Sequence, residues 1–441
     1  MRSTTALRLL GLACVGLLAV PGSAAADTSL PDPPAPAVLA PAVPGSGVAP
    51  TAAGVSGQIG SLVDARLGTG SVIVLDAATG AVLFDQRSDR SLIPASTLKL
   101  ATATAALEVL GPQTRLATVA SAYGDVVYLV GGGDPTLVRS GGGNPLAGGS
   151  ASLRDLAEQV ARSFTANSSI RVIYDDSAFE GPRLGPGWPR SFPSAGVVAP
   201  VTALVVDGGR VRPGAVSRVS DPALQAAKAF AGFLKAQGLD VTAVRAGTAK
   251  PDATEIGRVE SPTVEEIVQR MLTDSENNYA EALAHLVGGA SAGSPTFAGG
   301  AQATEDVLSG LGIDTTGLDL ADGSGLSGRN RLTASALAEA LHLASGGTDP
   351  GLAAIGPGLA VAGLTGTLAD RYQTAATRPG RGFVHAKTGT LTGVVSLAGT
   401  ALARDGRVLV FAMIANRVSS LAGMRDTMDR IASRLATCGC S

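Results

Sequence analysis

The sequence has few cysteines and almost no net charge. Its 441 residues include three Cys, and the formal net charge is −2. Cys14 lies in an N-terminal segment that we expect to be removed, so the mature chain keeps only Cys438 and Cys440. A multi-disulfide framework is therefore excluded, and the fold must rest on an ordinary hydrophobic core. Two states stay open for the remaining pair, a local bond or a frayed tail with two thiols. No basic cluster interleaved with aromatic residues is present, which argues against nucleic acid as a partner.

The sequence also lacks an apolar run long enough to cross a bilayer comfortably. The apolar run at residues 9–20 is short, whereas a transmembrane helix needs about 20 apolar residues. Arg2 and Arg8 flank its start and Ala24-Ala25-Ala26 follows it, which predicts a secretory signal peptide over residues 1–26, cleaved after Ala26. We expect export across the cytoplasmic membrane to the cell envelope or periplasmic space, without a stable transmembrane span. An uncleaved anchor remains the alternative, and the place of Cys14 inside the apolar run argues against a lipid anchor.

The rest of the chain is long enough for two domains. Residues 27–56 are rich in Pro and Ala, which predicts a semi-rigid linker. We expect a discontinuous catalytic domain over residues 57–118 and 252–441. Residues 119–251 contain strands, Gly-rich turns and helices of their own, which predicts one inserted α/β domain.

Hydrophobic periodicity in the catalytic segments predicts an antiparallel sheet flanked by helices. A capping box at Thr263 marks the start of one helix. The expected strands are 71–75 and 81–84, which form a hairpin, and 383–390, 393–403 and 408–416. The expected helices are 58–66, 98–110, 263–272, 279–287 and 420–435. In the insertion we expect strands at 126–130 and 170–174 and helices at 152–164 and 222–237. The predicted fold class is α/β (α+β), with the last helix covering the sheet.

Lysine is scarce as well, and its placement is informative. The chain has five lysines, of which Lys99 and Lys387 lie in the motifs Ser96-Thr97-Leu98-Lys99 and Lys387-Thr388-Gly389-Thr390. A buried lysine can lose its proton near neutral pH whereas arginine cannot, so the use of Lys at these two places points to chemistry. Between the two motifs lies Ser275-Glu276-Asn277, the one Ser-x-Asn of the sequence.

Ser96 and Lys99 have the spacing of a nucleophile and its base. Three residues apart at the start of a helix, their side chains lie on one face. Against an apolar helix the Lys99 amine would favour its neutral form and could take the Ser96 proton, while the helix N-terminus favours a developing oxyanion. The alternative for an isolated Ser-x-x-Lys is a solvated lysine beside a capping serine.

The order Ser-x-x-Lys, Ser-x-Asn, Lys-Thr-Gly is the signature of the penicillin-recognising serine enzymes. Further segments make the resemblance closer, and over residues 71–416 the chain resembles the class C low-molecular-mass penicillin-binding proteins, the S13 D-alanyl-D-alanine carboxypeptidase and endopeptidase family. The segments are Gly131-Gly132-Gly133-Asp134-Pro135-Thr136-Leu137, Asp175-Asp176-Ser177, Gly181-Pro182-Arg183, Gly187-Trp188, Asp322-Gly323-Ser324-Gly325-Leu326-Ser327 and Gly366-Thr367-Leu368.

The resemblance implies a function. It implies the penicillin-binding-protein/β-lactamase-like transpeptidase fold and a serine-type D-Ala-D-Ala carboxypeptidase, or DD-endopeptidase, that needs no cofactor. The substrates would be peptidoglycan stem peptides, cleaved through an acyl-enzyme on Ser96, and β-lactam antibiotics would be covalent inhibitors.

The resemblance also implies roles for the site residues. Lys387 would supply a cation for a substrate carboxylate. Thr388 and Thr390 would supply hydroxyls, and Gly389 would leave room for the substrate to lie against the strand. Ser275 would relay a proton between Lys99 and the leaving amine, Asn277 would hold the substrate amide, and the backbone amides of Ser96 and Thr390 would form the oxyanion hole. The family has Arg directly after its Asp-Gly-Ser-Gly-Leu-Ser segment, where this chain has Gly328 followed by Arg329. This departure leaves open which side chain at the third position of the stem peptide is preferred.

Two other functions compete with this prediction. A serine β-lactamase would need a second base on a hydrolytic water, for which Glu180 and Glu260 are candidates by residue type alone. A catalytically idle cell-wall-binding scaffold would tolerate loss of Ser96, Lys99 or Lys387, and this chain has all three.

Four further residues have a structural and a functional interpretation. Asp134 could bind a peptide amine, but an Asp before Pro after three glycines is more typical of a turn. His385, two residues before Lys387, is expected to be a packed or edge histidine. His285 and His342 lie in apolar helical segments without Cys or carboxylates at ligand spacing, so we expect no metal site.

Overall fold

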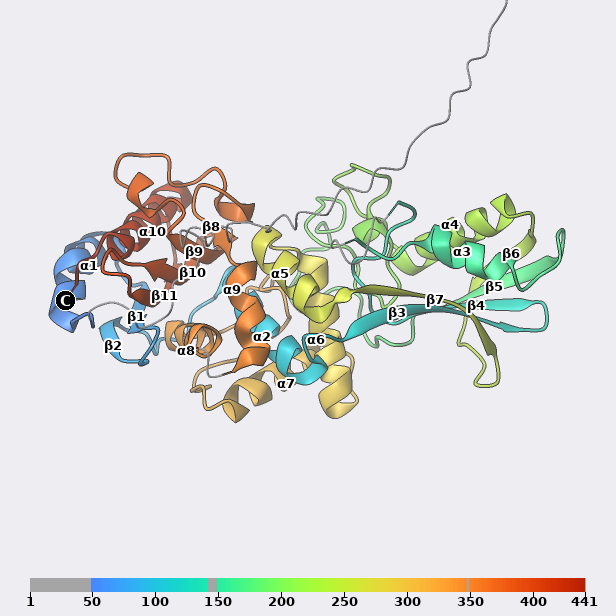
Figure 1. The fold of residues 1–441 in the computed structure, drawn as a ribbon, viewed down its shortest axis with the longest axis horizontal. Coiled ribbons are helices and arrows are strands. Elements are labelled where there is room, and N and C mark those ends of the chain that lie inside the picture. The colour runs from blue at the N-terminus through green and yellow to red at the C-terminus, as the bar shows by residue number, and fades with distance from the viewer. Residues whose placement is uncertain (1–48, 142–148, 347–348, 441) are drawn as a thin grey trace, which may run out of the picture. The chain divides into compact units, whose positions relative to one another are not determined.

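Two β-sheets organise the part of the chain that the structure describes. The computed structural model describes residues 49–141, 149–346 and 349–440. Within these ranges, one sheet has six strands in the order β2-β1-β11-β10-β9-β8, and the other has five in the order β6-β5-β4-β3-β7 (Figure 1). The strands are β1 (Ser71–Asp76), β2 (Val82–Gln86), β3 (Arg115–Tyr123), β4 (Val126–Gly131), β5 (Ser169–Asp175), β6 (Asp240–Ala246), β7 (Thr254–Thr263), β8 (Ala360–Val361), β9 (Val384–Leu391), β10 (Val394–Leu402) and β11 (Val408–Asn416). The helices are α1 (Ala52–Arg66), α2 (Lys99–Leu110), α3 (Leu153–Ala161), α4 (Pro222–Ala236), α5 (Val264–Asp274), α6 (Asn277–Ala292), α7 (Phe297–Gly310), α8 (Ala334–Ser345), α9 (Ile355–Gly358) and α10 (Leu421–Ala436).

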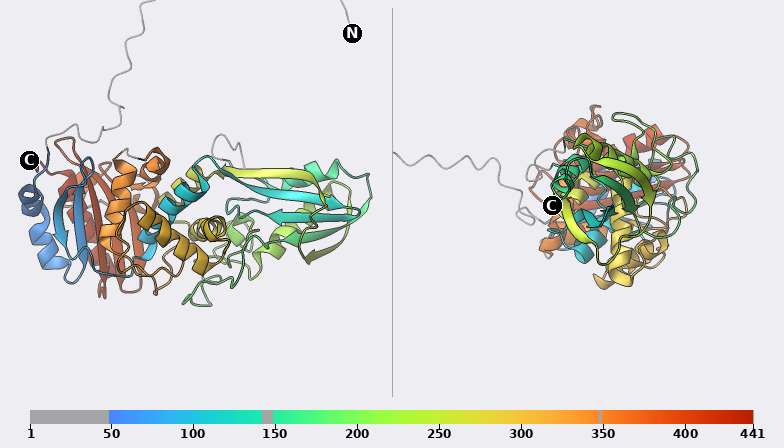
Figure 2. Two further views of the ribbon diagram at one scale, coloured as in Figure 1. Left: turned by 90° about the horizontal axis from the view of Figure 1, so that it is seen from below. Right: turned by 90° about the vertical axis from the view of Figure 1, so that its right-hand side faces the viewer.

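The six-stranded sheet confirms the predicted hairpin and the three predicted C-terminal strands. Every neighbouring pair in it is antiparallel. Both faces are buried, which explains why β11 is almost continuously apolar in sequence. Ala412 and Ile414 belong to a core shared with α2, α5 and α8, whereas Phe411 and Met413 belong to a core shared with α1 and α10. In the left view of Figure 2 the strands stand between α1, drawn in blue, and orange helical segments.

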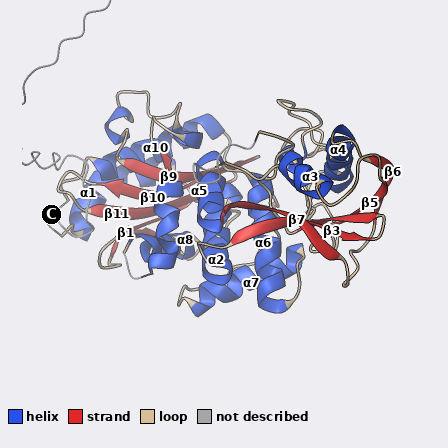
Figure 3. Cartoon of the chain, turned by 45° about the vertical axis from the view of Figure 1, so that its right-hand side comes forward, coloured by secondary structure: helices blue, strands red, loops and turns tan. Residues whose placement is uncertain are grey.

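The five-stranded sheet is mixed and has its own core. β3 pairs with β4 and β7 in antiparallel orientation, while β4-β5 and β5-β6 are parallel. The helices α3 and α4 cover it, with Leu156, Phe230 and Val172 among the buried residues (Figure 3). Three of its strands, β3, β6 and β7, were not predicted; β6 and β7 are largely exposed and leave little apolar alternation in the sequence, whereas β3 crosses the predicted boundary at residue 119.

The insertion begins and ends on paired strands. Arg115 at the start of β3 lies opposite Thr263 at the end of β7. The predicted boundaries differ from this arrangement, since residue 119 falls inside β3 and residue 251 precedes β7. The described residues form one compact unit, so the division into two domains stays a prediction.

Residues near the two ends of the described chain are hydrogen-bonded to each other. The helix α1 begins at Ala52, six residues before the predicted start and inside the predicted linker, because Thr51 caps it by accepting a hydrogen bond from the Gly54 amide at 3.0 Å. The Thr51 amide in turn donates to the carbonyl of Cys440 at 2.7 Å. Cys438 and Cys440 are buried and joined by a disulfide, so the frayed-tail alternative is wrong.

The predicted signal peptide and the first part of the linker, residues 27–48, lie outside the described residues. Within the described ranges, none of the helices combines the length and apolar character that crossing a membrane requires.

Candidate active site

Ser96 lies on a tight turn that leads into α2. A 3₁₀ turn at Ala95–Leu98 precedes the helix, and Ala95 has a left-handed φ of 49°. The turn is pressed against Gly325, where a Cβ would lie 2.0 Å from the carbonyl oxygen of Ala95. A side chain at Gly325 would therefore displace the backbone that carries Ser96.

Lys99 lies in the first turn of α2 with no exposed surface. Its Nζ donates to Ser96 Oγ at 3.1 Å, to Asn277 Oδ1 at 2.8 Å and to the carbonyl oxygen of Ser324 at 2.8 Å. Burial lowers the pKa of Lys99 to about 8, against the attraction of Glu281, Asp322 and Glu276, which raises it. A substantial share of Lys99 is therefore neutral near physiological pH, beside the hydroxyl whose proton it would take.

The Ser-x-Asn motif lies at the junction of α5 and α6. Ser275 ends α5 in a left-handed conformation, with φ 62°. Its Oγ accepts a hydrogen bond from Lys387 Nζ at 2.8 Å. Asn277 accepts from Lys99 and donates from Nδ2 to the carbonyl oxygen of Val197 at 2.8 Å.

These contacts differ from the predicted roles of the motif. The predicted relay placed Ser275 beside Lys99, but its hydrogen bond comes from Lys387. The side-chain amide of Asn277 was expected to hold the substrate; its oxygen accepts from Lys99 and one of its two N–H groups donates to Val197, so the second N–H keeps that role as a prediction. Each lysine thus holds one residue of the motif, and Asn277 positions Lys99.

Lys387 is the second buried lysine of the site. It lies on β9 with no exposed surface, and its Nζ donates to Ser275 Oγ at 2.8 Å and to the carbonyl oxygen of Thr388 at 2.9 Å. Burial, and secondarily repulsion by Lys99, lower the pKa of Lys387 well below its ordinary value. This weakens the predicted role of Lys387 as a standing cation for a substrate carboxylate.

Gly389 brings β9 against the turn that carries Ser96. A Cβ at Gly389 would lie 2.1 Å from Ser396 Oγ and 3.1 Å from the Ser96 amide nitrogen. Only glycine fits this approach. The contact brings together the strand that carries the Thr390 amide and the Ser96 amide, the two expected donors of the oxyanion hole.

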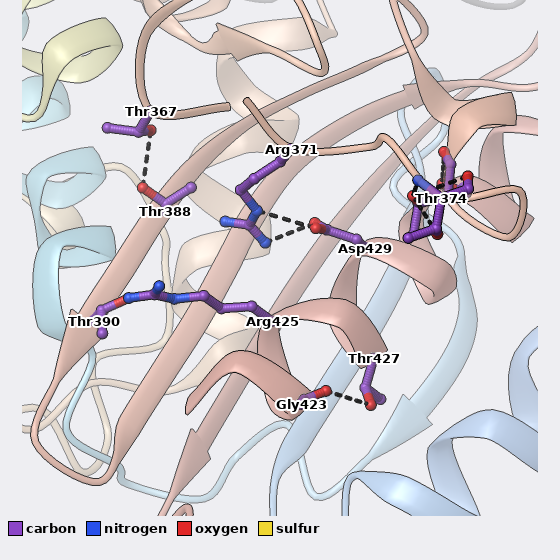
Figure 4. Close-up of polar contacts among 11 residues, drawn as sticks. Thr367, Arg371, Thr374, Thr388, Thr390, Gly423, Arg425, Thr427 and Asp429 are labelled. Carbon is purple, nitrogen blue, oxygen red and sulfur yellow. Dashed lines mark hydrogen bonds and ion pairs between the residues drawn. The ribbon is translucent and has the colours of Figure 1, made fainter. Parts of the chain in front are cut away.

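Thr388 and Thr390 point to the opposite side of the sheet from Lys387, as the alternation of a strand requires. Their neighbours on β9, Val384 and Ala386, belong to the core shared with α10. Thr388 Oγ1 donates to Thr367 Oγ1 at 2.9 Å, and Arg425 Nη2, from α10, donates to Thr390 Oγ1 at 3.1 Å (Figure 4).

A buried glutamate that was not predicted from the sequence fixes the loop next to Lys99. Glu281 lies on α6 and accepts hydrogen bonds from the amides of Ser324 at 2.8 Å and Gly323 at 3.1 Å. Burial, and then the nearby Asp322, raise the pKa of Glu281 to about 8. Because the Ser324 carbonyl accepts from Lys99, Glu281 fixes the loop that is hydrogen-bonded to Lys99. Its position one helical turn after Asn277, within an apolar helix, was the signal available in the sequence.

Asp322 fixes the rest of that loop. Its carboxylate accepts from Trp188 Nε1 at 2.8 Å, from the amides of Gly325 at 2.8 Å and Ser327 at 2.6 Å, and from Asn330 Nδ2 at 2.8 Å. The hydrogen bond from Trp188 ties the Gly- and Pro-rich segment of the predicted insertion to the loop beneath Ser96.

The structure also shows the surroundings of Asp134 and the three histidines, for which a structural and a functional role were considered. Asp134 Oδ1 accepts from the amide and hydroxyl of Thr136, both at 2.7 Å, which confirms the turn. His285 is buried between Phe179 and Phe297, and His342 Nδ1 lies 3.0 Å from the carbonyl oxygen of Ala77. The remaining predicted candidates lie at or near the surface: His385 is half-buried on β9, and Glu180, Glu260 and Arg329 are exposed.

Comparison with known proteins gives consistent matches. The D-Ala-D-Ala carboxypeptidase 3 (S13) family matches residues 60–218 and 212–437. A carboxypeptidase of Mycobacterium tuberculosis is 38% identical over 93% of this chain and 90% of its own length. Carboxypeptidase DacB of Mycolicibacterium smegmatis is 37% identical over 94% of this chain and 91% of its own length. Among solved structures, penicillin binding protein 4 of Haemophilus influenzae superimposes with a TM-score of 0.73 at 20% identity, covering 86% of this chain and 99% of that one. The superposition confirms the predicted fold class.

Proposed function

Because this chain belongs to the D-Ala-D-Ala carboxypeptidase 3 (S13) family, we propose that it removes the terminal D-alanine of peptidoglycan stem peptides through an acyl-enzyme on Ser96. The contact that carries this proposal is the 3.1 Å hydrogen bond between the buried Lys99 amine and Ser96 Oγ. A lysine with a lowered pKa beside a serine on a helix N-terminal turn is an activated nucleophile. The family membership supports the predicted activity, and the individual residue roles below are part of the proposal.

The acylation step follows from the contacts of Ser96. Neutral Lys99 takes the hydroxyl proton while Oγ attacks the carbonyl carbon of the penultimate D-alanine. The amides of Ser96 and Thr390 stabilise the oxyanion. The C–N bond then breaks and the terminal D-alanine leaves as a free amine. A water molecule hydrolyses the ester, which releases the shortened peptide and restores Ser96.

The leaving nitrogen needs a proton, and Ser275 is placed to give it. Its Oγ accepts from Lys387 at 2.8 Å, so its own hydroxyl proton is free to pass to the leaving amine. The protonated form of Lys387, which its lowered pKa makes a ready proton donor, then replaces that proton. The proton that Lys99 took from Ser96 restores Lys387 through solvent before the next cycle. In this assignment Lys387 serves proton transfer and Asn277 orients Lys99.

β-Lactams present a strained amide to the same nucleophile, and we propose that they acylate Ser96. Penicillin binding protein 4 of Haemophilus influenzae, which shares the fold, has been solved in complex with a β-lactam. The competing β-lactamase function finds no support in its two candidate bases, since Glu180 and Glu260 are exposed and Glu260 lies on β7 near Arg258.

The predicted signal peptide, together with a substrate that lies outside the cytoplasmic membrane, supports an extracytoplasmic location. We also propose that residues 119–251, extended to the whole of β3 and β7, form an inserted domain that shapes access to Ser96. The hydrogen bonds from Asn277 to Val197 and from Trp188 to Asp322 support this role.

The experiment that tests the function uses purified muropeptides. Pentapeptide monomers and cross-linked dimers are incubated with the protein, and the products are analysed by mass. Loss of one D-alanine from monomers identifies a carboxypeptidase, and conversion of dimers to monomers an endopeptidase. Labelled penicillin gives a second measurement, because an acyl-enzyme that lasts minutes or longer fits a peptidase, whereas rapid turnover would identify a β-lactamase.

A further inference from the structure

The proposed reaction leaves one substrate group without a cation. A peptide that ends in D-alanine carries a free carboxylate next to the scissile bond, and Lys387 was expected to bind it. Lys387 Nζ is instead buried, donates to Ser275 Oγ and the Thr388 carbonyl, and faces a second lysine across the site. A permanent cation is needed elsewhere along the same strand.

Three arginines can be compared for this task. Arg371 lies on the side of the sheet where Thr388 and Thr390 point, but its Nε and Nη2 donate to Asp429 at 3.0 and 2.6 Å (Figure 4). Arg329, the residue displaced by one position, is exposed and lies beside Gly187 rather than beside β9. Arg425 remains, and it reaches β9 directly, with Nη2 3.1 Å from Thr390 Oγ1.

The charge of Arg425 is uncompensated by its acidic neighbours on α10. Asp426 pairs with Arg430 at 2.7 Å, and Asp429 pairs with Arg371. Among the ion pairs of the described residues, none includes Arg425, which is exposed. A guanidinium stays protonated at any pH of interest and offers several donors in one plane, so one donor can hold Thr390 while others bind a carboxylate.

The strand beside Arg425 has an open edge. The short strand β8 pairs only with His385 and Ala386 of β9, so the part of β9 from Thr388 onward is available to an extended peptide. The hydroxyls of Thr388 and Thr390 project to the Arg425 side of this edge, next to Thr367 (Figure 4). A carboxylate that leaves the edge on that side meets the guanidinium and the Thr390 hydroxyl, and it meets the Thr388 hydroxyl once that proton turns away from Thr367.

We propose that Arg425 binds the free C-terminal carboxylate of the peptide substrate, together with the hydroxyls of Thr388 and Thr390. This assignment rests on the proposed function and makes Arg425 a residue that determines specificity for peptides ending in a free acid. Lys387 then keeps its task in proton transfer.

The test compares a D-alanyl-D-alanine peptide with its C-terminal amide in four proteins: the parent, Arg425→Gln, Arg425→Lys and the control Arg430→Gln. Arg430 lies on the same helix and carries the same charge, so its substitution controls for loss of charge on α10. The parent should favour the acid in kcat/KM. Loss of one charge-assisted contact should lower kcat/KM for the acid by about 10- to 100-fold in Arg425→Gln and leave the amide within about 3-fold. Arg425→Lys should keep part of the preference for the acid over the amide, and Arg430→Gln should keep all of it.

A purely structural role for Arg425 would instead lower both substrates equally. Lys387→Ala provides the opposite pattern, since loss of proton transfer should slow the acid and the amide by similar factors. An acid preference that persists in Arg425→Gln, or a parent that shows no preference, overturns the assignment. Failure of the proposed function is distinguishable, because the parent would then cleave neither peptide, releasing neither D-alanine from the acid nor D-alaninamide from the amide.

The rate of acylation by a penicillin is a second measurement, and it tests Ser96 as the nucleophile independently of peptide cleavage. The rate of covalent labelling by the free acid and by its methyl ester is compared in the same proteins, with the same expected ratios. A parent that is labelled by neither compound refutes the nucleophile, and with it the assignment of Arg425.

Discussion

The rate of Ser96 acylation should rise with pH through an apparent pKa near 8, because Lys99 must be neutral to take the serine proton. At pH 7 an amine with that pKa is neutral in roughly one molecule in ten, against about one in three thousand for an ordinary lysine. Burial of Lys99 therefore raises the share of active base by about 300-fold. The acylation rate should increase about 10-fold from pH 6 to pH 7 and level off above about pH 9.

The measurement is the second-order rate of labelling by a fluorescent penicillin between pH 6 and 9.5, with the stability of the reagent checked at each pH. Lys99 and Lys387 repel each other, so the observed value belongs to the pair of amines rather than to one of them. Lys99→Arg is the matched variant, because it keeps the charge and cannot release the proton. A rate that is flat or falling between pH 6 and 8, or labelling of Lys99→Arg at the parent rate, would refute Lys99 as the base.

Three other substitutions test separate parts of the structure. Ser96→Ala should abolish covalent penicillin labelling and release of D-alanine while the unfolding curve stays that of the parent; labelling at the parent level would require another nucleophile. Glu281→Gln removes a carboxyl group that burial keeps largely protonated below about pH 8, so the rising limb of the pH profile should stay close to that of the parent between pH 6 and 7, and a clear move to lower pH would show that Glu281 is charged there and raises the pKa of Lys99. Arg407→Ala should lower the free energy of unfolding by about 3–5 kcal/mol in urea, because it leaves the buried carboxylate of Asp76, now 2.8 Å from Arg407 Nε, without its ion-pair partner. A loss below about 1 kcal/mol would show that water or the backbone amides suffice for Asp76.

The elements that could be predicted from sequence are those whose burial leaves a periodic pattern. Both faces of β11 are buried, and its run of apolar residues is plain in sequence. The helix α5 carries a complete capping box at Thr263 and Glu266. By contrast, β7 alternates polar residues along a mostly exposed strand, so only its pairing with β3 makes it a strand. The predicted insertion boundaries differ for the same reason, since they follow changes in composition and not strand pairing.

Motif order located Ser96 and the two lysines, but it could not assign their hydrogen-bond partners. Residues 99, 277 and 324 are far apart in the chain, and their contacts depend on how α2, α6 and one loop pack. Spacing therefore predicted Lys99 beside Ser96, which are three residues apart. It could not show that Ser275 contacts Lys387, or that Asn277 bonds both Lys99 and the carbonyl of Val197.

The charge arrangement gives a physical reason for placing the carboxylate anchor outside the buried site. A base must lose its proton easily; burial lowers the pKa of both lysines, and repulsion by Lys99 lowers that of Lys387 further. A fixed cation required to stay charged beside Lys99 would have to be desolvated in the same place, at a cost of several kcal/mol. A fixed anion beside Lys99 would raise its pKa and remove the base, and Glu281 limits this effect because burial raises its own pKa to about 8. Arg425 avoids the conflict, since it is exposed, reaches the edge of β9 from α10, and keeps its charge without changing the proton affinity of the buried amines.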